Sequence, residues 1–167
     1  ALHSPVPAPL GPGAYTEVTL DVPELNLVGR VDFIFVSASR CEITDYKSGA
    51  PRAEHDEQLR LYALLWSRDR VRNPTSVPAQ KLTVAYPGHD RAVEPPSDLE
   101  LQALAEQILG RIESATSDLE GRPPTAKPTE ANCTYCTVRH LCDEYWQSHL
   151  VRRAWQASRV EHFADVE

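Results

Sequence analysis

The chain has 167 residues, of which 41% are hydrophobic and 25% are charged, and its formal net charge is −7. This composition is typical of one soluble globular domain and excludes a disordered tail or a collagen-like chain. The acidic balance gives no general attraction to nucleic acid, although it does not exclude an enzyme with a locally basic channel. No apolar run approaches the roughly 18 residues of a membrane helix, and no secretory signal is visible, so we expect a cytoplasmic protein.

The first third of the chain predicts three strands. Residues 1–13 are rich in Pro and Gly and predict an extended lead-in. Alternating apolar residues then predict strands over 14–22, 27–37 and 41–47, with short turns between them. The second and third of these are close enough in sequence to form a hairpin.

The rest of the chain alternates helix and strand. Apolar residues at helical spacing predict a helix from 53 to about 70, and residues 81–87 predict a fourth strand. Ser97 with Glu100 forms a capping box for a helix that runs to about 119. After a Pro-rich loop, a last helix is expected near 137–148, with a pattern that can be followed to 155. The order β-β-β-α-β-α predicts a small core with a mixed sheet.

One group of polar residues is expected at the end of this sheet. Asp45, Tyr46 and Lys47 end the third strand, and Asp32 lies in the strand before it, among apolar residues. Carboxylate oxygens are the ligands that Mg²⁺ and Mn²⁺ prefer, and the Tyr46 carbonyl is a further candidate ligand. Asp45 and Lys47 leave the same face of the strand, so Lys47 would lie beside a metal held by Asp45. An Asp-x-Lys triplet alone is a weak signal, because acidic and basic residues alternate on many solvated strands.

Two residues of the next helix extend the group. Gln58 and Tyr62 are at i and i+4 and therefore share one face of the helix. They can contact the substrate or support the site. The competing interpretation places Tyr62 in the core and leaves Gln58 exposed.

These motifs together resemble the RecB-type branch of the PD-(D/E)XK nucleases. The family pattern G-x-x-D, D-x-K and Q-x-x-x-Y corresponds to Gly29 with Asp32, Asp45 with Lys47, and Gln58 with Tyr62. The resemblance runs from about residue 15 to residue 145. It implies an α/β fold like that of restriction endonucleases, with a mixed sheet flanked by helices.

The resemblance also implies roles for these residues. The two Asp bind a divalent metal, the Lys assists attack by a water whose pKa the metal lowers, and the Gln and Tyr position DNA or the catalytic groups. Glu17 is a further candidate metal ligand, because many members carry a carboxylate in the preceding strand. Members often also have a metal-binding His on an upstream helix. His3 is the only His before Asp32, and we expect that helix to lie outside this chain.

A cysteine-rich segment follows the nuclease motifs. Cys133, Cys136 and Cys142 are spaced C-x₂-C-x₅-C, which favours a metal or cluster site over a disulfide framework. Zinc requires four ligands, and His140 can complete a Cys₃His site; three unligated thiols are the remaining alternative. The resemblance instead implies a [4Fe–4S] cluster, because a subset of RecB-type nucleases, including AddAB-type and CRISPR adaptation nucleases, ends in this triplet. Their fourth Cys lies upstream, whereas Cys41 is expected in the core.

The sequence therefore predicts a metal-dependent deoxyribonuclease, with exonuclease-type action in DNA repair, recombination or defence. Its nuclease domain is expected over 14–148, with a C-terminal helix and tail over 149–167 that can lead into a further region. The expected partners are DNA and a helicase or other subunit, with no membrane. Two alternatives remain open: a non-catalytic DNA-binding or scaffolding module of this fold, and a zinc-stapled interaction domain.

Overall fold

The computed structural model describes residues 8–120 and 126–148, and the chain separates into two compact units, 1–113 and 114–167. The first unit contains the sheet, and residues 126–148 of the second form three short helical segments. Helix α2 (Asp98–Glu120) begins in the first unit and ends in the second.

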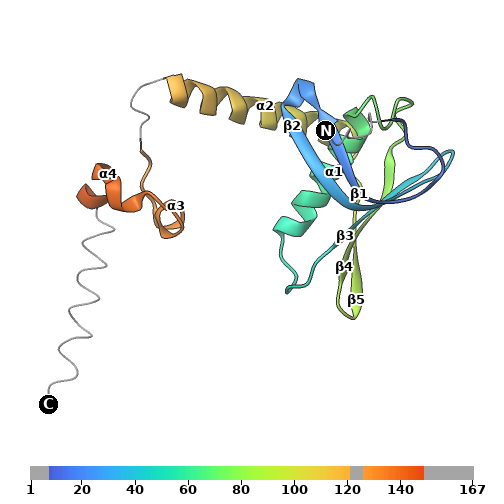
Figure 1. Cartoon of the computed structure of the whole chain (residues 1–167), viewed down its shortest axis with the longest axis horizontal. Helices are drawn as coiled ribbons and strands as arrows, with labels where there is room; N and C mark the ends of the chain where they lie inside the picture. The colour runs from blue at the N-terminus through green and yellow to red at the C-terminus, as the bar shows by residue number, and fades with distance from the viewer. Residues whose placement is uncertain (1–7, 121–125, 149–167) are drawn as a thin grey trace, which may run out of the picture. The chain divides into compact units, whose positions relative to one another are not determined.

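Five strands form one sheet in the order of the chain. They are β1 (Gly13–Val22), β2 (Leu27–Val36), β3 (Cys41–Tyr46), β4 (Ala79–Tyr86) and β5 (His89–Val93). The β3–β4 pair is parallel and the other pairs are antiparallel. Helix α1 (Glu54–Arg68) connects the two parallel strands, as a parallel pair requires. Figure 1 shows this arrangement, which confirms the predicted α/β class with a mixed sheet.

The core lies between α1 and one face of the sheet. Buried residues alternate with more exposed ones along β3 and along parts of β1, β2 and β4, as residues that point to opposite faces of a sheet do. The largest fully buried side chain is Trp66 of α1, whose Nε1 donates to the Val77 carbonyl at 2.7 Å. Gly29 of β2 permits the close approach of α1, because a Cβ atom there would overlap Leu65 Cδ1 and lie 3.3 Å from Tyr62 Cε1. Packing against α1 therefore explains the glycine of the G-x-x-D motif.

Strand β5 was not predicted from the sequence. It follows β4 through a tight turn at Pro87 and Gly88, with Tyr86 paired to His89. Gly88 has φ +86°, as the third position of a type II turn requires, and Pro fits the second. Only Val93 of β5 is buried, so its sequence shows no clear apolar alternation.

The C-terminal segment differs from the predicted single helix over 137–148. It consists of α3 (Glu130–Thr134), the 3₁₀ helix η2 (Arg139–Leu141) and α4 (Asp143–Gln147). Val138, Leu141 and Trp146 are exposed among the described residues, so no buried apolar face supports a continuous helix. The expected continuation to 155 and the lead-in residues 1–7 lie outside the described residues. Within residues 8–120 and 126–148, no helix combines the length and the apolar character needed to cross a bilayer.

Candidate active site

The polar residues of the D-x-K motif lie at the carboxyl end of β3, under the first half of α1. Asp45 alternates with buried Cys41 and Ile43 and therefore faces the helix. The Lys47 backbone N–H donates to the Ala85 carbonyl at 2.9 Å, which continues the β3–β4 pairing one step beyond the strand. Lys47 therefore emerges on the same side as Asp45.

A chain of polar contacts links β3 to α1. Lys47 Nζ lies 2.7 Å from Asp45 Oδ2 and donates to Gln58 Oε1 at 2.7 Å. Gln58 Nε2 in turn donates to the Tyr62 hydroxyl at 2.7 Å. Because an ammonium group can only donate, Lys47 fixes the orientation of the Gln58 amide. The structure thus brings Asp45, Lys47, Gln58 and Tyr62 together, and Tyr62 belongs to the core as well.

Asp45 is the most unusual member of this cluster. It is only 1% exposed, and its buried Oδ2 lies 2.7 Å from Lys47 Nζ, with no other donor from the described residues. Burial raises the pKa of Asp45, and the charge of Asp32 adds to this, whereas the hydrogen bond and the charge of Lys47 and the charge of His55 oppose it. A buried carboxylate that has one ammonium as its partner remains costly, and a bound cation would lower that cost.

Asp32 lies beside Asp45 on the neighbouring strand. The β2–β3 register pairs Phe33 with Thr44, and one further step places Asp32 opposite Asp45. Asp32 Oδ2 accepts a hydrogen bond from the Tyr46 backbone N–H at 2.8 Å, which fixes this carboxylate at the end of β3. Two carboxylates from adjacent strands therefore meet at one edge of the sheet.

Glu17, the further candidate ligand, is not brought into this cluster. It stands opposite Asp32 in the β1–β2 register, but its carboxylate lies 2.5 Å from Arg30 Nε, and both side chains are exposed. Its φ of +56° is in the left-handed region, which is uncommon for a residue other than glycine.

The donor set at this edge fits a hard divalent cation. Asp32 and Asp45 supply carboxylate oxygens, and the buried Asp45 oxygen has Lys47 as its single partner, which leaves it able to accept a cation. Mg²⁺ is commonly bound through one or two carboxylates, with waters completing the coordination. Across the described ranges 8–120 and 126–148, no three His, Cys, Asp or Glu side chains converge as a ligand set, so the protein offers two carboxylates rather than a closed cage. His3 lies outside these ranges.

A second polar group beside the site was missed from the sequence. His55 Nδ1 lies 2.8 Å from the Tyr86 hydroxyl, and the Tyr86 ring stacks on His89 with ring centroids 5.0 Å apart. Arg91 lies over the same ring at 5.7 Å and pairs with Asp56. His55 precedes Gln58 and Tyr62 by three and seven residues, so the helical spacing contained the signal.

The cysteine segment does not form a metal site in the described residues. Cys133 is buried, Cys136 is exposed and Cys142 is half-buried, and all three are free thiols. They do not converge with one another or with His140 as a ligand set. Cys41 is buried in the core of the first unit, as expected, and burial raises the pKa of its thiol to about 12, so it remains protonated.

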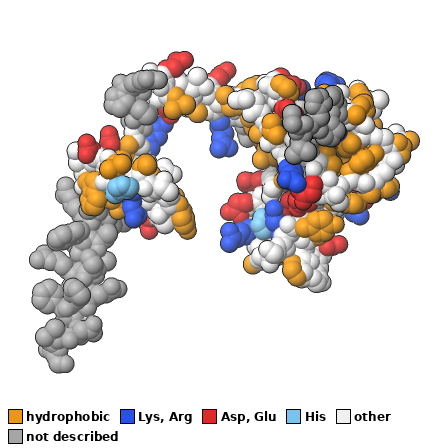
Figure 2. Space-filling view, viewed as in Figure 1, with side chains coloured by type: hydrophobic (Ala, Val, Ile, Leu, Met, Phe, Trp, Pro, Cys, Tyr) orange, Lys and Arg blue, Asp and Glu red, His pale blue; other side chains and the backbone are white. Residues whose placement is uncertain are grey.

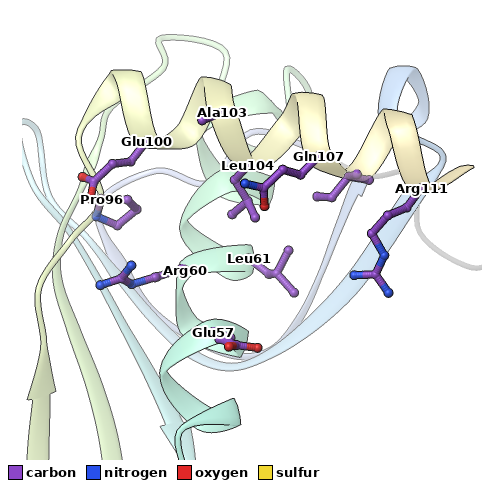
Figure 3. Close-up of a pocket in the computed structure, with 10 residues that line it drawn as sticks. Glu57, Arg60, Leu61, Pro96, Glu100, Ala103, Leu104, Gln107 and Arg111 are labelled. Atoms are coloured by element: carbon purple, nitrogen blue, oxygen red, sulfur yellow. The ribbon is translucent and has the colours of Figure 1, made fainter. Parts of the chain in front are cut away.

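A separate groove lies between α1 and the first part of α2. Its volume is about 440 Å³, and Figure 3 shows Arg60, Leu61 and Leu104 among its lining residues. None of the motif residues lines it, because Gln58 and Tyr62 face the sheet instead. On the face of the sheet unit visible in Figure 2, acidic and basic side chains are interspersed rather than gathered into one basic stripe.

Comparison with known proteins agrees with the geometry of the site. The family profile of the PD-(D/E)XK nuclease superfamily matches residues 6–143. No curated protein matches the chain. Among solved structures, one titled "Crystal structure of SSO0001" is 22% identical, with a TM-score of 0.41. The match covers 78% of this chain and 60% of that one.

Proposed function

The chain belongs to the PD-(D/E)XK nuclease superfamily, and we propose that it is a divalent-metal-dependent deoxyribonuclease of the RecB type. The observation that carries this proposal is Asp45, a buried carboxylate that has no backbone donor from the described residues, an adjacent lysine as its partner and a second carboxylate on the next strand. A purely structural aspartate would have its oxygens satisfied by protein donors. The G-x-x-D, D-x-K and Q-x-x-x-Y order supports the RecB-type assignment.

In the proposed reaction, Asp32, Asp45 and the Tyr46 carbonyl would hold Mg²⁺ or Mn²⁺, and Glu17 would contribute only after leaving Arg30. When bound, the cation would supply positive charge that offsets the charge of the phosphate and promotes ionisation of water. Lys47 orients the attacking water and stabilises the charge that develops on the scissile phosphate. Gln58 holds the Lys47 ammonium in place, and Tyr62 holds Gln58.

The wider context is also proposed from the motif order. The resemblance to RecB-type nucleases supports exonuclease-type action in repair, recombination or defence, in the cytoplasm and alongside a helicase or other subunit. The chain spans 60% of the length of the solved structure named above.

A [4Fe–4S] cluster on Cys133, Cys136 and Cys142 is proposed from the resemblance of this triplet to that of a subset of RecB-type nucleases, with zinc as the alternative. The three thiols do not form a ligand set in the described residues, so the cluster enters no step of the reaction. Iron, sulfide and zinc analysis of the full chain purified without oxygen separates a cluster from a zinc site. Finding neither metal would leave three free thiols and would contradict both assignments.

The test of the nuclease is cleavage of end-labelled single- and double-stranded DNA with Mg²⁺ or Mn²⁺, beside Asp45→Ala. We expect the parent to cleave, chelator to abolish cleavage, and Asp45→Ala to be slower by about 1000-fold, because it loses both the metal ligand and its charge. Equal cleavage by Asp45→Ala would contradict the assignment. If neither protein cleaves but the parent binds DNA, the non-catalytic module is favoured; if it binds no DNA, the interaction domain is favoured.

A further inference from the structure

A second hollow lies at the same end of the sheet, beside the catalytic cluster. It has a volume of about 560 Å³ and is open to solvent. The paired positions Tyr46, Ala85 and Asp90 run across β3, β4 and β5 on the face turned away from α1, and all three line it. The small Ala85 side chain leaves space between the larger side chains on either side.

The walls of this hollow combine an aromatic face with polar groups. Tyr46 is 60% exposed, so its ring is accessible to a ligand. Pro87 adds an apolar wall, and Ser48 and Asp90 add a hydroxyl and a carboxylate. The carboxylate repels a phosphate but accepts hydrogen bonds from the amino and imino groups of a nucleobase. Apart from Lys47 at its border, the lining therefore suits a base rather than the backbone of DNA.

The strand end beneath the hollow is held by contacts on the opposite face of the sheet. Tyr86 borders the hollow, but its ring is buried on the α1 side, where its hydroxyl contacts His55, its ring stacks on His89 and the Arg91 guanidinium lies over it. A strand end that is already ordered loses little entropy when a ligand binds.

Lys47 connects this hollow to the reaction. It lines the hollow, and its ammonium contacts Asp45 and Gln58 in the catalytic cluster. A base in the hollow would therefore belong to a nucleotide next to the phosphate that is cut.

From this arrangement we propose that the hollow is a nucleobase subsite, which binds one unpaired base stacked on Tyr46 with its edge toward Asp90. A base held in this way is not paired in a duplex, so the subsite makes single-stranded DNA the preferred substrate. This inference rests on the proposed deoxyribonuclease function, but it concerns binding and can fail separately from it.

The test is a double-mutant cycle between the protein and the DNA. A single-stranded oligonucleotide of about 12 nucleotides, within the usual site sizes, carries an abasic residue at one position at a time. Its affinity is measured by fluorescence anisotropy in Ca²⁺, with gels to verify that it stays intact, for the parent, Tyr46→Ala and Tyr46→Phe. Val28→Ala is the control, because Val28 is also an exposed strand residue, at 62%, and lies at the far end of β2.

We expect Tyr46→Ala to bind about tenfold more weakly, as loss of one base-stacking contact predicts, and Tyr46→Phe to retain the affinity. For the parent, one abasic position should cause a similar loss, and Tyr46→Ala should lose nothing more at that position. Duplex DNA should bind more weakly than the single strand, and Val28→Ala should match the parent.

The proposal is overturned if Tyr46→Ala binds as tightly as the parent, or if the affinity of the parent is the same at every abasic position. It is also overturned if the loss caused by Tyr46→Ala and the loss caused by the abasic residue add when the two are combined. It is also overturned if blunt duplex binds as well as the single strand. Because the abasic scan of the parent needs no variant, the proposal stays testable even if a substitution at Tyr46 impairs folding. A parent that binds as expected but cleaves no DNA would contradict the nuclease and leave the subsite standing.

Discussion

Two buried aspartates lie beside helix α1, Asp45 of β3 near its amino-terminal half and Asp69 at its carboxyl end, and they differ in what surrounds them. At its carboxyl end, Asp69 is 2% exposed, and its Oδ1 accepts the backbone N–H groups of Val71 and Arg72 at 2.9 and 2.8 Å. Its Oδ2 accepts the backbone N–H of Asp21 in β1 at 3.0 Å. Next to it, the buried Asn73 side chain bonds to Trp66 and Val77 through both its oxygen and its nitrogen.

At the amino-terminal half of α1, Asp45 of β3 is as deeply buried, but no backbone N–H of the described residues bonds to it. Its Oδ2 contacts the Lys47 ammonium alone, and burial raises the pKa of Asp45. Burial therefore does not distinguish these two carboxylates, whereas the number of backbone donors does. We infer that the hydrogen bonds of Asp69 stabilise the fold, whereas Asp45 provides a site for a ligand.

The largest expected effect on folding is at the satisfied end. Asp69→Ala removes three hydrogen bonds to a charged acceptor and the link from α1 to β1, so we expect a loss of about 3 kcal/mol in the free energy of unfolding. Chemical denaturation measures it. Asp21→Ala is the control, because it keeps the bonded backbone N–H, and its exposed side chain should change stability by less than about 0.5 kcal/mol. Equal losses in the two variants would show that the Asp69 bonds contribute little.

A somewhat smaller effect is expected near Asp45, on the rate of DNA cleavage. Lys47→Ala should slow DNA cleavage by about 100-fold, as the loss of one group that stabilises transition-state charge predicts, and should leave Mn²⁺ binding largely intact by calorimetry. Lys81→Ala is the matched control, because Lys81 lies on β4, is 62% exposed and faces Glu42 rather than the site. If Lys47→Ala cleaves as fast as Lys81→Ala, Lys47 has no part in the reaction.

Much of the catalytic end could be predicted from the sequence, because its information is local. Asp45 and Lys47 are two residues apart on a strand, and Gln58 and Tyr62 are one turn apart on a helix, so each pair shares a face by geometry alone. Their meeting required only that the helix cross back over the sheet, and Lys47 does contact Gln58.

The parts that were missed depend on contacts between distant segments or on weak local patterns. The bonds from Asp69 to Asp21 and from His55 to Tyr86 join residues far apart in sequence, and no spacing rule connects them. Strand β5 has a polar sequence because only Val93 is buried, so its pairing with β4 is set by the Pro87–Gly88 turn instead. In the cysteine segment the spacing suggested one helix, but few apolar side chains are buried there to stabilise it.

The smallest expected effect is on how stability depends on pH. The pKa of Asp45 is raised above its ordinary value of 3.8, so the folded protein holds that proton more tightly than the unfolded chain. The contribution of Asp45 to stability is therefore complete below pH 3.8 and is lost as pH rises through the raised pKa. Asp45→Asn, which cannot ionise, should remove this slope, as measured by denaturation in chelator across that range.

The two aspartates give opposite expectations for added metal. Mn²⁺ at neutral pH should raise the melting temperature of the parent, because a ligand that binds only the folded state stabilises it, and should leave that of Asp45→Asn unchanged. Asp69→Asn should keep the full increase, because that carboxylate is already satisfied by backbone donors.

If the parent instead gained stability relative to Asp45→Asn as pH rose in chelator, the ion pair with Lys47 would outweigh burial. Asp45 would then be a satisfied carboxylate like Asp69, and the contrast between the two ends of α1 would fail.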